Sequence, residues 1–189
     1  MTRQTCILVV MTLTLTALAG GSARADHEAR DGWAIGYELH RAQDDFGMGG
    51  SIATPRFAGD RLRIAIGAGG AWSPHAVTSD GEQDWAGYGQ LDLVLEAGAR
   101  APGSPVRIYG FGGPMLFLRP ERLSDDGLAL GGVGGFGFEY YFMDDGRDGP
   151  VSYFTELGGL GTSARADKLA GSPMLANGFL IAVGLRWTL

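Results

Sequence analysis

The chain has 189 residues, 33 of them glycine, and a formal net charge of −6 at pH 7. Residues 1–25 contain Arg3 and Arg24 but no acidic residue, so residues 26–189 hold 15 − 2 = 13 basic and 21 acidic side chains, a net charge of 13 − 21 = −8. This balance argues against nucleic acid as a partner, which requires a basic surface. The only cysteine is Cys6, which excludes disulfides and cysteine catalysis after residue 25.

Residues 1–25 have the three parts of an export signal. Arg3 gives a positive start, residues 6–19 are apolar, and Ala23-Arg24-Ala25 is a small-residue cleavage motif. The apolar run is shorter than the about 20 residues that a membrane-spanning helix needs. We therefore predict a cleaved signal peptide over residues 1–25 and a single domain over residues 26–189.

The remaining chain contains eight segments in which apolar and polar residues alternate with a period of two, as in β-strands with two different faces. In chain order they are 33–41, 47–55, 61–72, 85–97, 106–117, 128–142, 151–162 and 178–189. No helical period stands out after residue 26. Pro114 cannot donate a backbone hydrogen bond, so it predicts a bulge or an early strand end in the fifth segment. The pattern predicts an all-β protein.

The last segment shows the alternation most clearly. One face carries Phe179, Ile181, Val183, Leu185, Trp187 and Leu189, whereas the other carries Leu180, Ala182, Gly184, Arg186 and Thr188. An apolar face toward lipid and a polar face toward the lumen allow the strands of a closed barrel to span a membrane. The connections between segments fit this arrangement, because longer connections alternate with shorter ones. The longest is Ser163–Asn177.

The four tryptophans stand at segment ends. Trp33 and Trp187 belong to one end of the predicted barrel, and Trp72 and Trp85 belong to the other. Amphipathic rings prefer the interfaces between a membrane and water, so we predict two aromatic girdles. A soluble secreted β-barrel, in which the tryptophans cap a core, is the alternative. Extraction from isolated outer membranes with detergent distinguishes the two.

With its signal, its eight alternating segments, its aromatic ends and its terminal Gly184-x-x-Trp187-x-Leu189, the chain resembles the small outer-membrane barrels of the OmpA/OmpX-like superfamily. The resemblance extends over residues 26–189. It implies an eight-stranded antiparallel up-and-down transmembrane β-barrel in the bacterial outer membrane. The terminal pattern resembles the signal read by the barrel-assembly machinery, although Leu189 stands where the family usually has Phe.

The predicted inner faces carry many charged residues. The polar network that we expect in the lumen consists of Glu38, Arg61, Arg63, Asp92, Glu96, Arg107, Glu139, Glu156 and Arg186. Eight strands enclose an interior just wide enough to be filled by side chains, so we expect a structural plug in place of an open pore. Glycines on the same faces, such as Gly137, leave room for long side chains opposite.

Opposite charges are expected to pair across neighbouring strands. Counting with the tryptophans of the third and fourth segments opposite each other places Arg61 opposite Glu96. Similar counting for the other strands brings Arg107 near Glu139 and sets Arg186 diagonal to Glu38 across the closing seam. A guanidinium group and a carboxylate form two parallel hydrogen bonds, so such pairs neutralise charge in a confined space. A gated, ion-conducting lumen remains the alternative to the plug.

The sequence shows no cofactor motif and no zinc-ligand spacing, and its acidic turns do not match a calcium loop. Outer-membrane enzymes that hydrolyse or transfer lipid A acyl chains resemble the chain in size and topology, and they need a nucleophile and a base. His75 has Ser79 and Glu82 nearby in a predicted outer loop, and His40 lies in the first segment. A solvated loop histidine is the simpler interpretation, so we do not expect an enzyme.

We therefore expect a non-enzymatic outer-membrane barrel with a structural or surface-interaction role. Loops on a rigid scaffold carry binding, which makes loops 73–84, 118–127 and 163–177 the candidates for contact with an extracellular ligand. The expected partners are membrane lipids and lipopolysaccharide, together with the barrel-assembly machinery during biogenesis. A lipid A-modifying enzyme and a narrow channel for ions or solutes are the alternative functions.

Overall fold

The computed structural model describes residues 32–77, 83–101, 103–144 and 147–189. It contains eight strands: β1 Ala34–Ala42, β2 Asp45–Ala53, β3 Leu62–Val77, β4 Gln83–Arg100, β5 Val106–Leu118, β6 Leu128–Asp144, β7 Arg147–Thr162 and β8 Gly178–Thr188. The predicted signal peptide, Ser79, Glu82 and the side chain of His75 lie outside the described part. The expected segments all correspond to strands, and the main differences are that β3, β4 and β7 are longer.

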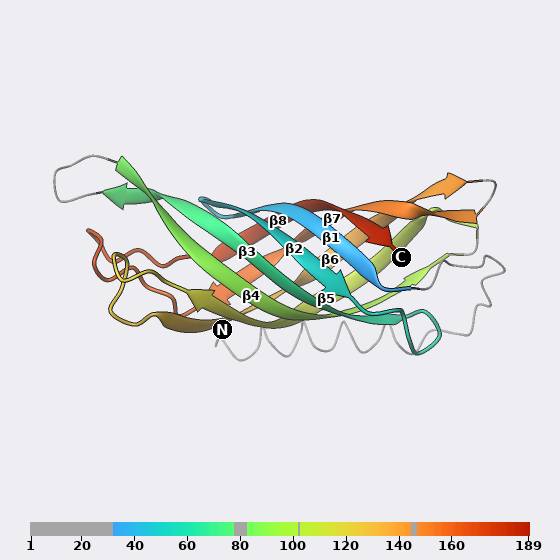
Figure 1. The fold of residues 1–189 in the computed structure, drawn as a ribbon, viewed down its shortest axis with the longest axis horizontal. Helices are drawn as coiled ribbons and strands as arrows, with labels where there is room; N and C mark the ends of the chain where they lie inside the picture. The colour runs from blue at the N-terminus through green and yellow to red at the C-terminus, as the bar shows by residue number, and fades with distance from the viewer. Residues whose placement is uncertain (1–31, 78–82, 102, 145–146) are drawn as a thin grey trace, which may run out of the picture.

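The strands form a closed barrel in which each strand pairs antiparallel with the next and β8 pairs with β1 (Figure 1). This confirms the predicted all-β, up-and-down fold. Closure satisfies the backbone hydrogen bonds of every strand and removes exposed sheet edges. We call the end with the β2–β3, β4–β5 and β6–β7 connections, where β8 finishes, the turn end. The opposite end, on the left in Figure 1, is the loop end.

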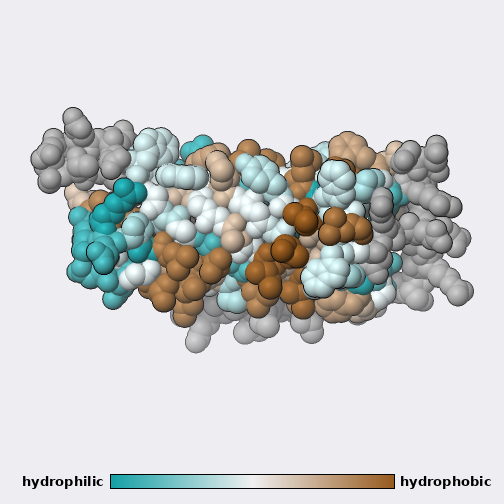
Figure 2. Space-filling view, in the orientation of Figure 1, coloured by the Kyte–Doolittle hydropathy of each residue, from teal (hydrophilic) through white to brown (hydrophobic). Residues whose placement is uncertain are grey.

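Apolar side chains face outward from the barrel. On β8, Phe179, Ile181, Val183, Leu185 and Trp187 are exposed, whereas Leu180, Ala182, Arg186 and Thr188 are buried. Figure 2 shows hydrophobic residues along the middle of the wall and hydrophilic residues gathered at the loop end. The described residues include no helix of the length and apolarity needed to cross a bilayer. The wall thus has the inside-out pattern of a barrel whose outer surface faces lipid.

The tryptophans lie near the two ends of the wall. Trp187 pairs with Ile35 at the turn end, and the carbonyl oxygen of Trp33 accepts a hydrogen bond from the backbone nitrogen of Leu189. Trp72 pairs with Phe46 toward the loop end. Trp33, Trp85 and Trp187 are 53–58% exposed, and Trp72 is half-buried.

The register of β3 against β4 differs from the expectation. Trp72 is opposite Gly87, two residues from Trp85, and a bulge follows between Ser73 and Ala76. A Cβ atom at Gly87 would lie 3.2 Å from the Trp72 ring, so the indole packs closely over this glycine. From Leu62 to Ser73, the pairs of the hairpin are thus shifted by two residues relative to the count that aligned the tryptophans.

Pro114 neither ends β5 nor produces a bulge, contrary to the expectation. β5 continues to Leu118 and keeps the same register against β4 on both sides of the proline. The pairing with β4 is interrupted only between Asp92–Met115 and Leu95–Gly112, because proline has no N–H group to donate. The neighbouring strand β6 pairs with Pro114 without interruption.

Candidate functional site in the barrel lumen

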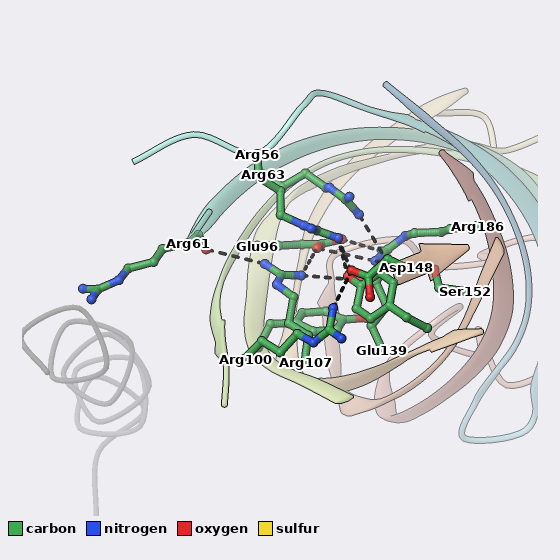
Figure 3. A network of polar contacts seen from close by, with 12 residues as sticks. Arg56, Arg61, Arg63, Glu96, Arg100, Arg107, Glu139, Asp148, Ser152 and Arg186 are labelled. Carbon is green, nitrogen blue, oxygen red and sulfur yellow. Dashed lines mark hydrogen bonds and ion pairs between the residues drawn. The ribbon is translucent and has the colours of Figure 1, made fainter. Parts of the chain in front are cut away.

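A cluster of arginine and glutamate side chains fills the turn end of the lumen (Figure 3). Its members are Arg56 from the β2–β3 connection, Arg63 from β3, Glu96 from β4, Arg107 from β5, Glu139 from β6 and Arg186 from β8. We call these six residues the ion cluster. All six are at least nine-tenths buried. The side chains come from different parts of the wall and point toward one another, so the cluster spans the lumen.

The two glutamates form the centre of the ion cluster. Nη1 of Arg107 donates to Oε2 of Glu96 at 2.9 Å and lies 3.4 Å from Oε2 of Glu139. Arg186 donates to Oε1 of Glu96 and has its Nη1 3.5 Å from Oε1 of Glu139. Each carboxylate is therefore shared between arginines. Charge-assisted hydrogen bonds of this kind offset the cost of burying ions, provided that both signs are present.

Hydroxyl groups also donate hydrogen bonds to the buried glutamates. Tyr141 and Ser152 donate to the two oxygens of Glu139, at 2.6 and 2.9 Å. Tyr109 donates to Oε1 of Glu156 at 2.7 Å. A Cβ atom at Gly137 would lie 2.5 Å from the Tyr109 ring, so this glycine makes room for the tyrosine, as the sequence suggested for inner-face glycines.

The structure corrects two of the expected charge pairs. Arg63, and not Arg61, is opposite Glu96, because of the two-residue shift of the β3–β4 register. Arg61 precedes β3 in the connection at the turn end, is half-buried, and extends away from the barrel in Figure 3. Its side chain therefore does not belong to the lumen network. Arg107 is opposite Glu139, as expected.

Arg186 does not pair with Glu38 across the closing seam. The register does place Glu38 diagonally from Arg186, since Glu38 is opposite Gly184. The long arginine side chain instead crosses the lumen to Glu96 on β4. Its Nη2 also lies 3.8 Å from Oε1 of Glu156 on the neighbouring strand β7. Glu38 contacts His40, with 3.2 Å between Oε1 and Nδ1.

Sequence reasoning missed Arg56 of the ion cluster and several hydroxyl-bearing residues around the buried glutamates. Tyr109, Tyr141 and Ser152 stand at inner-face positions of β5, β6 and β7, so the same alternation that identified Arg107 and Glu139 contained the signal for them. Arg56 has no such signal, because it precedes β3 in a connection without periodicity. It turns into the lumen and donates to the Tyr141 hydroxyl.

The middle of the lumen holds a small cavity of about 60 Å³, with polar and apolar side chains in its lining, between the ion cluster and the loop end. Its polar lining includes the predicted network residues Glu38, Asp92 and Glu156, together with Ser51 and Gln90. His40 also lines this cavity and is buried beside Gln90. A base at the outer rim of a lipid-modifying enzyme would need access from outside, which this placement does not give.

Residues 119–127 and 163–177, which connect β5 to β6 and β7 to β8, pack over the mouth at the loop end. We call these two connections the lid. The lid residues Leu123, Ala164, Ala166, Leu175 and Ala176 are 0–2% exposed and belong to one apolar cluster with Tyr88 and Phe117 of the barrel. The sequence predicted these loops only as candidate binding segments. Their packing places apolar side chains over the loop end of the barrel.

Polar contacts hold the lid in place. Asp45 at the start of β2 accepts hydrogen bonds from the Tyr88 hydroxyl at 2.7 Å and from the backbone nitrogen of Ala176 at 2.8 Å. Arg119 donates to the carbonyl oxygens of Arg165 and Leu128, at 2.7 and 2.9 Å. These bonds join the two connections of the lid to each other and to the barrel wall.

A closed eight-stranded barrel with an apolar outer wall and a charged, filled interior has the architecture of the small outer-membrane barrel proteins. Among solved structures, the N-terminal β-barrel domain of Pseudomonas aeruginosa OprF matches with a TM-score of 0.58 and 16% identity, over 86% of this chain and 100% of that one. A major outer membrane protein from Thermus thermophilus matches with a TM-score of 0.52 and 14% identity, over 83% of this chain and 99% of that one.

Comparison with protein-family models and with curated proteins gives no match. At the identities found among solved structures, the likeness establishes a shared fold. The chain therefore has the fold of the small outer-membrane barrels that its sequence resembles.

Proposed function

We propose that the protein is a non-enzymatic barrel of the bacterial outer membrane with a lumen plugged by side chains. The observation that carries this proposal is closure at both ends: the ion cluster fills the turn end, and the apolar lid covers the loop end. Between them lies a cavity of only about 60 Å³. The interior expected of eight strands leaves no room for an aqueous channel beside these side chains.

The proposed location follows from the surface of the barrel. Exposed apolar side chains cover the wall, and tryptophans stand near both ends, as at the two interfaces of a bilayer. Residues 1–25 act as the cleaved export signal in this proposal, and the pattern ending at Leu189 serves recognition by the barrel-assembly machinery. Membrane lipids and lipopolysaccharide are then the surroundings of the wall.

We assign the surface-interaction role to the outer side of the lid. Glu121, Arg122, Asp125, Arg165 and Lys168 are exposed there, whereas the apolar lid residues beneath them are buried. Since the lid is fixed to the barrel by hydrogen bonds, these side chains form a preorganised surface of mixed charge. Preorganisation lowers the entropic cost of binding. We propose that any extracellular ligand contacts this surface and the β3–β4 connection.

The deciding experiment has two parts. Fractionation of the bacterial envelope tests the location, and current recordings from the purified protein test the plug. We expect the protein in the outer membrane, extractable only with detergent, with gel migration that changes on heating as a closed barrel unfolds. In planar bilayers we expect no sizeable single-channel currents. Release without detergent would contradict the location, and steady currents would contradict the plug. A lipid A mass profile that changes with the gene would contradict the non-enzymatic role.

A further inference from the structure

In the lining of the cavity in the middle of the lumen, negatively charged side chains outnumber positively charged ones. Glu38 on β1, Asp92 and Glu96 on β4, and Glu156 on β7 contribute four carboxylates. The only arginine in the lining is Arg186, whose guanidinium group is already shared among Glu96, Glu139 and Glu156. Within the described chain, no arginine or lysine forms an ion pair with Glu38 or Asp92. Carboxylates in a confined, low-dielectric space are neutralised either by taking up a proton or by a compensating positive charge nearby.

His40 contacts two polar side chains that line this cavity, Glu38 and Gln90. Its Nδ1 is 3.2 Å from Oε1 of Glu38, and its Nε2 is 3.1 Å from Nε2 of Gln90. In the tautomer that carries its proton on Nδ1, His40 donates to Glu38 and accepts from the Gln90 amide. This arrangement turns the nitrogen of Gln90 toward His40 and leaves its oxygen for the cavity.

The Gln90 oxygen is an acceptor that lacks a donor. Gln90 is 5% exposed and lines the cavity, and its Oε1 has no hydrogen-bond partner among the described residues. A buried acceptor without a partner costs free energy, so a group that supplies positive charge or a donor is favoured there. Amide and carboxylate oxygens are the ligands that hard cations prefer.

We propose that the cavity binds a monovalent alkali cation together with a few waters, next to Oε1 of Gln90 and the carboxylates of Glu38 and Asp92. The volume of about 60 Å³ accommodates an ion and waters, since one water needs at least about 10–15 Å³. A divalent ion fits less well. In the described residues, no three His, Cys, Asp or Glu side chains converge closely enough to hold a metal ion directly, whereas calcium takes about 6–8 oxygen ligands.

The direct test is a crystal structure of the wild-type barrel grown with thallium(I), which substitutes for potassium and scatters anomalously. We expect an anomalous peak in the cavity beside Oε1 of Gln90. Water density there without an anomalous peak would overturn the proposal. Because this measurement uses the unaltered protein, it does not depend on whether a variant folds.

A second test measures the midpoint of the heat-induced gel shift in sodium, potassium and choline chloride at equal ionic strength. We expect the midpoint to be several degrees higher with sodium or potassium than with choline, because a ligand bound only to the folded state stabilises it. Asp92→Asn should abolish this difference. Asp60→Asn, the same change at an exposed turn residue, should retain it. Equal midpoints for the wild type in all three salts would contradict the proposal.

Discussion

Glu139 is the residue on which the contacts of the ion cluster converge. It accepts hydrogen bonds from Tyr141 and Ser152 and lies 3.4–3.9 Å from guanidinium nitrogens of four arginines. Glu139 and Glu96 are the two carboxylates of the cluster, so the four arginines exceed them in charge. Loss of either glutamate would leave buried guanidinium groups with much less compensation. Such uncompensated charge is the most expensive defect that a filled lumen can have.

We predict that Glu139→Ala lowers the free energy of unfolding by about 3–5 kcal/mol, the usual effect of removing one partner of a buried ion pair. Urea unfolding of the barrel folded into lipid vesicles measures this change. We expect no conductance from the variant in planar bilayers, because the lid still covers the loop end. Asp126→Asn, at an exposed lid position, is the control and should change stability by at most about 0.5 kcal/mol.

Two results would contradict this account of Glu139. A Glu139→Ala barrel as stable as the wild type would show that the cluster contributes little to folding. Large currents through the variant would show that Glu139 closes the lumen by itself, as in a gated channel. The second result would favour the channel interpretation over the structural plug.

At the scale of single elements, the strands could be predicted and their register could not. A lipid-facing wall forces alternation on each strand, so segments such as 178–189 were visible in the sequence. Alternation does not encode the register of β3 with β4, in which the Trp72 ring packs over Gly87. Because of the two-residue shift from the expected register, Arg63 and not Arg61 lies in the lumen.

The lid shows the same limit for loops. Residues 119–127 and 163–177 have no periodicity, so no pattern in the sequence indicated that Leu123 and Leu175 would be fully buried. The lid forms because these side chains complete an apolar cluster with Tyr88 and Phe117 at the barrel mouth. Asp45 then fixes it through the backbone of Ala176.

We predict that Asp45→Ala loosens the lid while the barrel stays folded. The substitution removes the acceptor for both Tyr88 and the Ala176 backbone, and leaves these buried donors without a partner. Trypsin should then cleave after Arg165 or Lys168 at least tenfold faster, which corresponds to about 1.4 kcal/mol of easier local opening. Mass spectrometry of the fragments gives the rate and the site.

Asp44→Ala is the matched control, because Asp44 is the neighbouring residue and its side chain is 47% exposed beside Arg41. Cleavage of this variant should proceed at the wild-type rate. If Asp45→Ala were cleaved no faster than Asp44→Ala, the apolar contacts alone would hold the lid. If both variants lost the heat-dependent gel shift, Asp45 would act on folding of the barrel and not on the lid.

At the scale of the whole molecule, the charged interior could be predicted as a set but not as a network. The alternation identified Arg107, Glu139 and Arg186 because every second residue of a strand faces the lumen. It could not show that Arg186 reaches Glu96 on a strand that is not its neighbour, because this depends on the width of the closed barrel. It also could not assign Arg56, which enters the lumen from a connection.

The outer wall permits a test of the membrane itself. Ile66 is 62% exposed on β3, between the turn end at Leu62 and Trp72 toward the loop end, and its outward neighbours Ile52 and Leu93 are also exposed. In water, exchanging such a surface residue changes stability by at most about 0.5 kcal/mol. At the middle of a bilayer, an arginine on the lipid-facing side of a barrel costs about 2–4 kcal/mol.

We therefore predict that Ile66→Arg destabilises the barrel in lipid vesicles by about 2–4 kcal/mol. Ala170→Arg, at an exposed position of the lid, introduces the same side chain at the polar end and should cost about 0–1 kcal/mol. Urea unfolding in vesicles gives both values. The contrast depends on depth in the membrane, because both substitutions add one charge. Equal stability of the two variants would mean that the exposed apolar wall faces water or another protein, and the prediction of two aromatic girdles at membrane interfaces would fail with it.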